Sequence, residues 1–457
     1  MFLRPTMVKR KTFDSIPDDL IIEIFSRLST KSIGRCRCVS KLWAFILYRH
    51  DFTELFLTKS SARPRVLFVV SQRLDWSFYS TPQPQNPYEK SSLVVAATDF
   101  HTNFSKGLSD IDCSYASGFI YFRNFHIPRE DEDAKRVMCN PLTGKYVILP
   151  KLGDISRHSY LGFDPLYKEF KVLVISVSYS SVIHYILTLG TEELRWRTIQ
   201  CPFKHLPCGK NICIHGVLYY SAQVDQGDQG YYDDVIVCFD VRYEKFKYIG
   251  LECCFDGLIN YKGKLGGINI EENFAPYLVE LSMWVLGDVD KQEWSKYAYT
   301  LWDESNVAIH KGDLSVSGMT ATGDIVLSMK YADNPFYVVY FNPERNTLQS
   351  VEIQGVPANR YSKVYAFVDY VEDLSVNNAM QLKPRLLKLV QNFVPKRPKP
   401  RRRRRKSRDL SKSSQSVKNK EQNMYGLSAN LLYRYAGLAI YIFVLFSLYF
   451  LFFLRLV

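Results

Sequence analysis

The sequence predicts an α+β multidomain protein: a short three-helix unit, then a mainly β, propeller-like domain, then a C-terminal transmembrane helix. Apolar residues recur at helical spacing near the N-terminus, and β-branched and aromatic runs separated by turn residues fill the middle. Near the C-terminus, twenty uncharged residues follow one another. At 457 residues the chain is too long for one ordinary core. We therefore expect a helical unit at 12–53, a β domain at 64–375, a basic disordered linker at 395–423 and a transmembrane helix at 435–454.

Charge is unevenly distributed along the chain. From Lys396 to the C-terminus there are fifteen Lys or Arg and two Asp or Glu, which accounts for the whole formal net charge of +13. The preceding residues are balanced in sign, so their bulk charge gives no indication of nucleic-acid binding, and no nucleic acid is expected as a partner. Ten cysteines are scattered without paired CxxC motifs. We expect free thiols in a reducing compartment, no zinc site and no cofactor.

The run 435–454 is long enough to cross a bilayer, since about 20 apolar residues span a hydrocarbon core roughly 30 Å thick. Ten of the thirteen residues from Lys396 to Arg408 are cationic. Placed before a membrane span, such a stretch predicts that the rest of the chain stays in the cytosol. It could also contact anionic lipid headgroups or act as a nuclear localisation signal. We expect a tail-anchored membrane protein, with the endoplasmic reticulum as the expected membrane, and the nucleus or cytoplasm if the anchor is not used. For the run 435–454 the alternative is a buried hydrophobic helix of the β domain. For the basic stretch the alternative is a solvated linker that no specific partner recognises.

The N-terminal unit shows three helical segments. Pro17 suits a first helical turn, and the two aspartates that follow suit the positive end of a helix dipole. One apolar face recurs at helical spacing through Leu20, Ile21, Ile24 and Leu28. Ser29 with Thr30 ends this helix and starts a second, and Ser40 can cap a third. About 40 residues bury too little apolar surface to be stable alone, so the apolar stripe predicts a docking surface.

The pattern from Ile16-Pro17-x-Asp19-Leu20 to Val39-Ser40-Lys41-x-Trp43 resembles the F-box motif, and it is most similar to the plant type. The resemblance implies binding to the Skp-type adaptor of a cullin-RING ubiquitin ligase. By the same resemblance, the residues that form or support the adaptor-binding face are Pro17, Leu20, Ile24, Leu28, Val39 and Trp43. Two positions depart from the motif: Gly34 stands where an aliphatic residue is usual, and Cys36 where phenylalanine is usual. A thinly packed second helix and weaker adaptor binding follow as expectations. The alternative is a three-helix packing unit unrelated to ubiquitin.

The middle of the chain shows a repeat of about 50 residues. Turn signals recur near positions 140, 192, 240, 288 and 342, and glycine opens a further strand run between most of them. About four strands per repeat is typical of propeller blades, with a β-sandwich or an irregular β domain as the alternative. The segments Cys-Asn-Pro-Leu-Thr-Gly at 139–144 and His-Gly-Val-Leu-Tyr-Tyr at 215–220 resemble the F-box-associated domain of plant F-box proteins. That domain is kelch-like, and the resemblance implies that it binds target proteins.

No motif for bond chemistry is present: GxSxG, HExxH, GxxxxGK[ST] and GxGxxG are all missing from the sequence. Among eight histidines, His158, His184 and His215 fall in strand-like runs, where we expect satisfied structural groups. We therefore expect no enzyme and no catalytic residue. The favoured function is the substrate-recognition subunit of an SCF-type E3 ubiquitin ligase, which holds an unknown protein target near the charged conjugating enzyme. The alternative is a membrane-anchored β-propeller scaffold or enzyme with a vestigial F-box.

Overall fold

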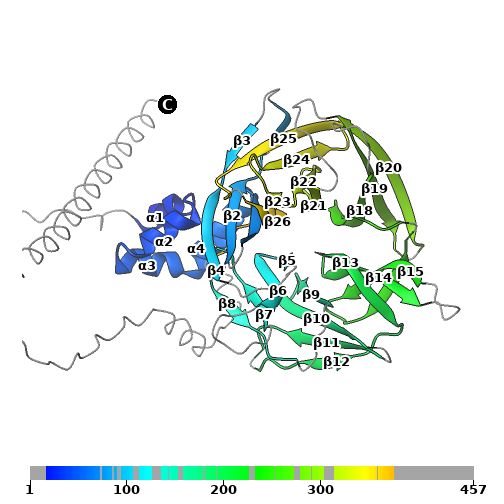
Figure 1. Ribbon diagram of the computed structural model, residues 1–457. Helices are drawn as coiled ribbons and strands as arrows, with labels where there is room; N and C mark the ends of the chain where they lie inside the picture. Colours follow the sequence, from blue (N-terminus) through cyan, green and yellow to red (C-terminus); the bar gives the residue numbers. More distant parts are fainter. Residues whose placement is uncertain are drawn as a thin grey trace, which may run out of the picture. The chain divides into compact units, whose positions relative to one another are not determined.

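Helices open the described part of the chain, and β-strands make up nearly all the rest of it (Figure 1). The computed structural model describes residues 17–374 except the short segments 73–74, 85–86, 90–93, 106–112, 126–134, 143, 153–157, 179–180, 192, 226–231, 252, 272–277, 290, 303–312 and 358. The helices are α1 (Asp18–Phe25), α2 (Thr30–Arg37), α3 (Lys41–Tyr48) and α4 (His50–Ser61). The 3-10 turn η2 (Pro87–Glu89) lies within the β domain.

The expectation of three helices was wrong, because α4 is a fourth. Its buried side chains recur at helical spacing, with Phe52, Phe56 and Ser60 four residues apart. The expected boundary at residue 53 cuts this helix, whose rings at Phe52 and Phe56 are fully buried in the small helical core. The helical unit therefore extends to about residue 61 in the structure.

Six sheets, in which nearly all strand pairs are antiparallel, form the blades of a β-propeller, and Figure 1 shows them arranged as a ring. Blade 1 contains, in spatial order, β23 (Tyr331–Ala332), β26 (Asn359–Tyr370), β1 (Arg65–Gln72), β2 (Asp75–Pro82) and β4 (Asp99–Ser105). Blade 2 contains β5 (Cys113–Ala116), β6 (Phe119–Phe125), β7 (Lys135–Cys139) and β8 (Tyr146–Ile148). Blade 3 contains β9 (His158–Asp164), β10 (Glu169–Val177), β11 (Val182–Thr188) and β12 (Arg197–Ile199).

The other three blades follow in chain order. Blade 4 contains β13 (His205–Ile214), β14 (Val217–Asp225), β15 (Tyr232–Asp240) and β16 (Phe246–Gly250). Blade 5 contains β17 (Gly257–Tyr261), β18 (Lys264–Glu271), β19 (Leu278–Asp288) and β20 (Glu293–Trp302). Blade 6 contains β21 (Leu314–Met319), β22 (Ile325–Met329), β24 (Tyr337–Asn342), β25 (Thr347–Gln354) and β3 (Val94–Ala97). In this blade β3 pairs parallel to β25, whereas the other strand pairs are antiparallel.

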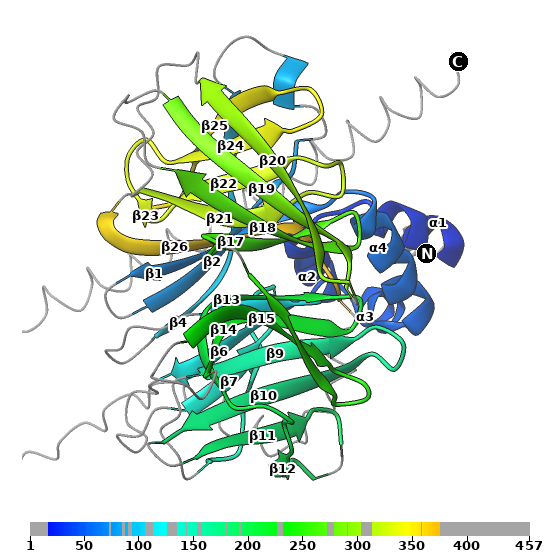
Figure 2. The same ribbon diagram turned by 90° about the vertical axis from the view of Figure 1, so that its right-hand side faces the viewer.

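The ring is closed by strands from both ends of the β domain. In blade 1, β26 pairs antiparallel with β1, so that Phe68 lies opposite Ala366 and Val70 opposite Val364. Pairing the two ends in one sheet holds the first and last parts of the β domain in a single blade, so the ring cannot open without breaking this strand pairing. Figure 2 shows the same blades turned by 90°, with β9, β10 and β11 side by side as their pairing requires.

The propeller has no single core. Instead, each pair of neighbouring blades encloses its own cluster of buried apolar side chains. Tyr160 of blade 3 stacks on Tyr220 of blade 4, with ring centroids 4.7 Å apart, in one such cluster. Trp76 of blade 1 packs on Phe122 of blade 2, with centroids 4.9 Å apart, in another. Because the apolar faces of adjacent sheets are buried against each other, every blade depends on its two neighbours.

An ion pair adds to the contact between blades 3 and 4. Arg242 lies in the turn after β15, and Asp164 is the last residue of β9. The guanidinium of Arg242 donates to the Asp164 carboxylate at 2.7 Å. This hydrogen-bonded pair lowers the pKa of Asp164 to about 2. The Asp164 side chain also accepts the backbone N–H of Leu166 at 2.9 Å, the local turn contact expected of Asp before Pro.

The expected transmembrane helix is contradicted by the structure. Among the described residues, no helix is both long and apolar enough to cross a membrane. The longest of them, α4, has 12 residues and would be about 18 Å long, and it carries Asp51, Glu54 and Lys59. Residues 395–423 and 435–454 lie outside the described residues. Neither a C-terminal transmembrane helix nor the tail-anchored localisation built on it is supported.

Acidification is expected to destabilise blade 1 through His101 of β4. Its ring lies 2.7 Å from the Ser80 hydroxyl, and burial together with Arg65 lowers its pKa to about 4. The folded chain keeps this ring neutral while the unfolded chain protonates it near pH 6.5, so stability present above pH 6.5 is lost as the pH falls towards 4. The expected loss of unfolding free energy from His101 between pH 7 and 5 is about 2 kcal/mol.

Urea unfolding at pH 7 and at pH 5 measures this loss of unfolding free energy. A His101→Gln variant should lose less stability than wild type on acidification, and an equal loss in both would contradict the assignment.

Candidate functional site

Six large apolar side chains of the helical unit point to solvent. They are exposed by 44–67%, and they comprise Leu20, Ile24, Val39, Leu42, Phe45 and Tyr48. We call these six residues the exposed apolar set. A unit of this size rarely leaves so much apolar surface uncovered unless a partner covers it. The exposed apolar set is therefore the candidate functional site.

Helix α1 presents two members of the set because its other faces are occupied. Pro17 precedes the helix, and Ile21 and Phe25 are buried beneath it. On its polar side, Lys59 of α4 donates to the Glu23 carboxylate at 2.6 Å. This contact, with a second from Arg27, lowers the pKa of Glu23. The contact between α4 and α1 leaves Leu20 and Ile24, one helical turn apart, on the outer face.

Helices α2 and α3 begin at serine caps, as the sequence predicts. The Ser29 hydroxyl accepts the backbone N–H of Ser32 at 3.4 Å, and the Ser40 hydroxyl accepts that of Trp43 at 3.1 Å. Each cap satisfies one of the free N–H groups of the first turn. The turn between the two helices carries Val39, which is 65% exposed.

The residues expected to bind the adaptor divide into two groups in the structure. Pro17, Leu20, Ile24 and Val39 are exposed. Leu28 and Trp43 are half-buried and pack against the small helical core, where the rings of Trp43 and Phe25 meet edge to face with centroids 4.9 Å apart. The first group can contact a partner directly, whereas the second holds the helices that present it.

Three residues of α3 belong to the exposed apolar set but were not among the expected adaptor-binding residues. Leu42, Phe45 and Tyr48 recur every three residues, and their exposed fractions are 44%, 67% and 65%. The signal was present in the sequence, because positions i, i+3 and i+6 of a short helix share one broad face. The guanidinium of Arg37 lies 4.1 Å from the centre of the Tyr48 ring, which joins the end of α2 to this face.

The two departures from the motif have different consequences. Cys36 is half-buried against the helical core, and burial raises the pKa of its thiol. Gly34 is exposed on α2, and a Cβ added there would meet no atom within 4 Å. The glycine therefore leaves no void in the core, and its cost is limited to helix propensity.

Gly34→Ala is expected to stabilise the helical unit. The added methyl group enters open space, and alanine is favoured over glycine inside a helix by up to about 1 kcal/mol. Chemical denaturation of the full chain, followed by far-ultraviolet circular dichroism, measures the change. Arg35→Ala, a change at an exposed position of the same helix between two residues of similar helix propensity, serves as the control and should change stability much less. Destabilisation by Gly34→Ala would show that α2 needs glycine for a reason other than space.

The helical core is completed by residues from the propeller. Leu374, just beyond β26, is buried in the same cluster as Ile33, Ile46 and Phe52, and Leu142 from the turn after β7 packs at its edge. Nearby, burial raises the pKa of the Glu372 carboxyl, which is hydrogen-bonded to Thr30 at the start of α2. The helical unit thus depends on the β domain for part of its core while its outer face stays free.

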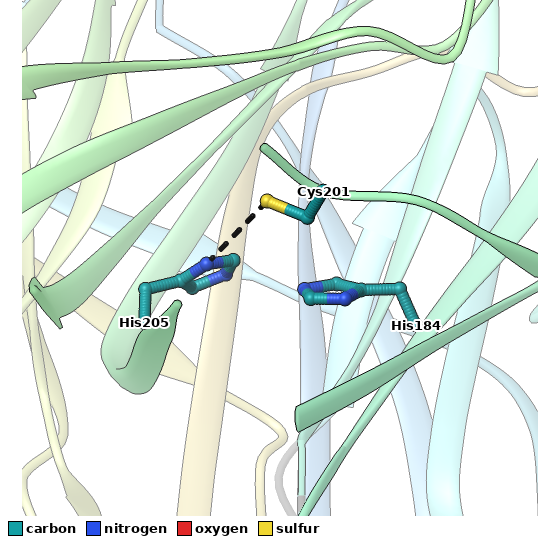
Figure 3. Close-up of side chains that lie close together, drawn as sticks. All are labelled: His184, Cys201 and His205. Atoms are coloured by element: carbon teal, nitrogen blue, oxygen red, sulfur yellow. Dashed lines mark hydrogen bonds between the residues drawn. The ribbon is translucent and has the colours of Figure 1, made fainter. Parts of the chain in front are cut away.

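A second cluster, of His184, Cys201 and His205, lies between blades 3 and 4 (Figure 3). His184 is on β11, Cys201 is in the link after β12, and His205 begins β13. The Cys201 sulfur lies 3.8 Å from Nδ1 of His205. Burial lowers the pKa of both histidines to about 4 and raises the pKa of the Cys201 thiol to about 11. A nucleophilic cysteine needs a lowered thiol pKa, so these residues do not form an activated Cys–His pair.

The fold and the exposed apolar set together define a class of protein: a small helical docking unit joined to a six-bladed propeller. Comparison with known families agrees with this class. The F-box domain model matches residues 13–55, and the model described as "F-box associated beta propeller domain" matches residues 65–371. The chain belongs to the plant F-box proteins that carry an F-box-associated β-propeller domain.

Relatives in Arabidopsis thaliana match over most of their length. F-box only protein 12 is 52% identical over 453 residues, which covers 97% of this chain and 98% of that protein. F-box protein At3g57590 is 50% identical over 393 residues, which covers 81% of this chain and 93% of that protein. Among solved structures, TolB from Acinetobacter baumannii gives a TM-score of 0.36 at 11% identity over 72% of this chain and 73% of its own, too low to support an inference. Family membership supports a general role in substrate recognition within an SCF complex, with a Skp-type adaptor as partner.

Proposed function

We propose that the chain is a substrate receptor of an SCF-type ubiquitin ligase and that the exposed apolar set is its adaptor-binding surface. Leu20, Ile24 and Pro17 would contact the adaptor from the α1 side. Val39 and the three residues Leu42, Phe45 and Tyr48 would contact it from the α2–α3 side. Leu28 and Trp43 would act from beneath, by holding α1 against α3.

The observation that carries this proposal is the contrast between the two faces of one small unit. Its inner face is buried, with Ile33, Ile46 and Leu47 all at 0% exposure. Its outer face leaves Phe45 and Tyr48 more than half exposed, although aromatic side chains of this size are mostly buried in a chain on its own. Aromatic and aliphatic residues are the usual anchors at the centre of a protein–protein interface.

In this proposal the propeller holds a protein target and performs no bond chemistry. Catalysis would arise because a lysine of the target is held close to a charged conjugating enzyme, which raises its effective concentration. The deeply buried apolar faces between the blades make the propeller a rigid platform, with its loops and turns exposed for target recognition.

A binding experiment with the full chain tests the proposal on the α3 side. Wild type and a Leu42→Asp/Phe45→Asp variant are titrated with a purified Skp-type adaptor in a calorimeter. The variant is expected to bind at least tenfold more weakly, because two charges would enter the apolar interface.

The matched control is Leu166→Asp/Tyr167→Asp in the β9–β10 turn, where the native side chains are 65% and 64% exposed. It introduces the same charges on an exposed apolar pair of the propeller and should bind like wild type. Failure of the wild-type chain to bind the adaptor, or equal binding by the α3 variant, would contradict the proposal.

A further inference from the structure

Three side chains with metal-binding atoms meet between blades 3 and 4. The ligand atoms of His184, Cys201 and His205 all lie within 4.8 Å of one another. Both histidines are at least 95% buried, with exposed fractions of 4% and 1%. Figure 3 shows the two imidazole rings facing each other with the Cys201 sulfur above the gap between them.

The hydrogen bonding of the cluster leaves one nitrogen of each ring directed to this gap. Nε2 of His205 is bonded to the Tyr220 hydroxyl at 2.8 Å, which leaves Nδ1 facing the Cys201 sulfur. Nε2 of His184 is buried and has no hydrogen-bond partner. A buried polar atom without a partner is uncommon in folded proteins and calls for a ligand or another explanation.

The surroundings match those of a metal site. The rings of Phe203 and Phe246 pack on the histidines, with centroids 5.2 Å from His205 and His184 respectively, and form an apolar shell. Tyr220 holds the far nitrogen of His205, the arrangement that fixes ring orientation in many metal–histidine sites. His205 and Lys204 also line a pocket of about 490 Å³, which reaches the cluster at His205.

We propose that His184, Cys201 and His205 bind a divalent transition-metal ion, zinc in particular, and that this ion ties blade 3 to blade 4. Thiolate and imidazole are ligands that zinc prefers, and the cluster offers no carboxylate of the kind that calcium or magnesium needs. Tetrahedral zinc places neighbouring ligand atoms roughly 3.3–3.6 Å apart. The Cys201–His205 pair is close to that spacing at 3.8 Å, and small side-chain rotations would bring in His184.

Binding would release the thiol proton of Cys201 to solvent, because only the thiolate coordinates the ion. Three protein ligands leave the fourth position to water from the adjoining pocket. The inference is independent of adaptor binding, since the cluster belongs to the propeller and the exposed apolar set to the helices. Its expected consequence is a more stable contact between blades 3 and 4.

The test uses the full chain after treatment with a chelator, and cobalt(II) and zinc(II) as probes. Cobalt(II) is expected to bind with one ion per chain and to give the absorption bands of a thiolate-coordinated tetrahedral ion, which zinc(II) then displaces. Cys201→Ser should lose the thiolate-to-cobalt band. Tyr220→Phe should keep the band and weaken metal binding by roughly tenfold, because the ring of His205 loses its positioning partner.

Cys208→Ser is the matched control, because Cys208 is an exposed cysteine on β13, the strand that also carries His205. It should retain wild-type cobalt spectra and stoichiometry. Thermal unfolding gives a second readout: zinc should raise the transition temperature of wild type and Cys208→Ser but not of Cys201→Ser. The absence of a thiolate-to-cobalt band in wild type, or its persistence in Cys201→Ser, would overturn the proposal, as would its loss in Cys208→Ser.

Discussion

Replacing Leu20 and Ile24 together by aspartate is expected to weaken binding of a Skp-type adaptor by about thirtyfold or more, the effect of losing a contact worth about 2 kcal/mol at the centre of an interface. Both side chains are about half exposed, at 55% and 52%, and lie one turn apart on α1. Their removal takes little from the helical core, which Ile21 and Phe25 supply on the opposite face. Affinity should therefore fall while the fold is retained.

The measurement is calorimetric titration of the full chain with the adaptor, together with thermal unfolding of each variant. A conservative Leu20→Met/Ile24→Leu variant keeps the apolar surface and should bind within a few-fold of wild type. Unchanged affinity in the aspartate variant would show that α1 is not part of the interface. Equal weakening in the conservative variant would show that the change acts through the fold.

Leu374→Ala is expected to destabilise the helical unit although it lies more than 300 residues away in the chain. Leu374 is buried at 6% exposure in the helical core with Ile33 and Phe52. Truncating a buried leucine typically costs about 2–5 kcal/mol. A unit of four short helices cannot absorb such a loss easily, so adaptor binding should weaken as well.

Hydrogen exchange in the full chain separates the two parts of this prediction. Amides of α1–α4 should exchange faster in Leu374→Ala, while those of blades 3–5 stay protected. The control is Leu301→Ala, which truncates a leucine of β20 buried at 3% exposure in the cluster between blades 5 and 6. It should speed exchange in those blades and leave the helices unchanged. Equal effects of the two variants on the helices would contradict a shared core.

Much of the propeller could be predicted because its turns follow local chemistry. Each of blades 2–6 has one of the predicted turn signals, near 140, 192, 240, 288 and 342 in turn, between its third and fourth strands along the chain. Strand β3, which comes earlier in the chain than the rest of blade 6, is left out of this numbering. The glycines that open second strands are also placed by local geometry. Gly118, Gly216 and Gly263 have φ of 85–87° and follow a residue that also has positive φ, the backbone of a tight hairpin turn.

Blade 1 gave no such signal because its outer strands β2 and β4 are not joined by a short turn: η2 and β3, which pairs in blade 6, lie between them in the chain. Its strands come from both ends of the domain, and the pairing of β1 with β26 joins residues about 300 positions apart. Helix α4 was missed for a different reason: its buried positions include Thr53 and Ser60, which weaken the apolar pattern on which the prediction relied.

The candidate site was predicted only in part. Motif positions located α1 and the α2–α3 turn, but they did not distinguish exposed Leu20 from half-buried Leu28. The sequence pattern placed both in one helical stripe, whereas α1 ends at Phe25 and Leu28 lies in the turn that follows. The His184–Cys201–His205 cluster could not be predicted, since its members come from two blades whose packing brings them together. Only the short spacing between Cys201 and His205 was a local indication.

The most direct test of the adaptor-binding surface is hydrogen exchange of the full chain with and without a Skp-type adaptor. We expect slower exchange in α1, α2 and α3, strongest in the segments around Ile24, Val39 and Phe45, with the blades little changed. Slower exchange confined to the blades, or no change in the helices at saturating adaptor, would contradict the assignment of the exposed apolar set as the docking surface.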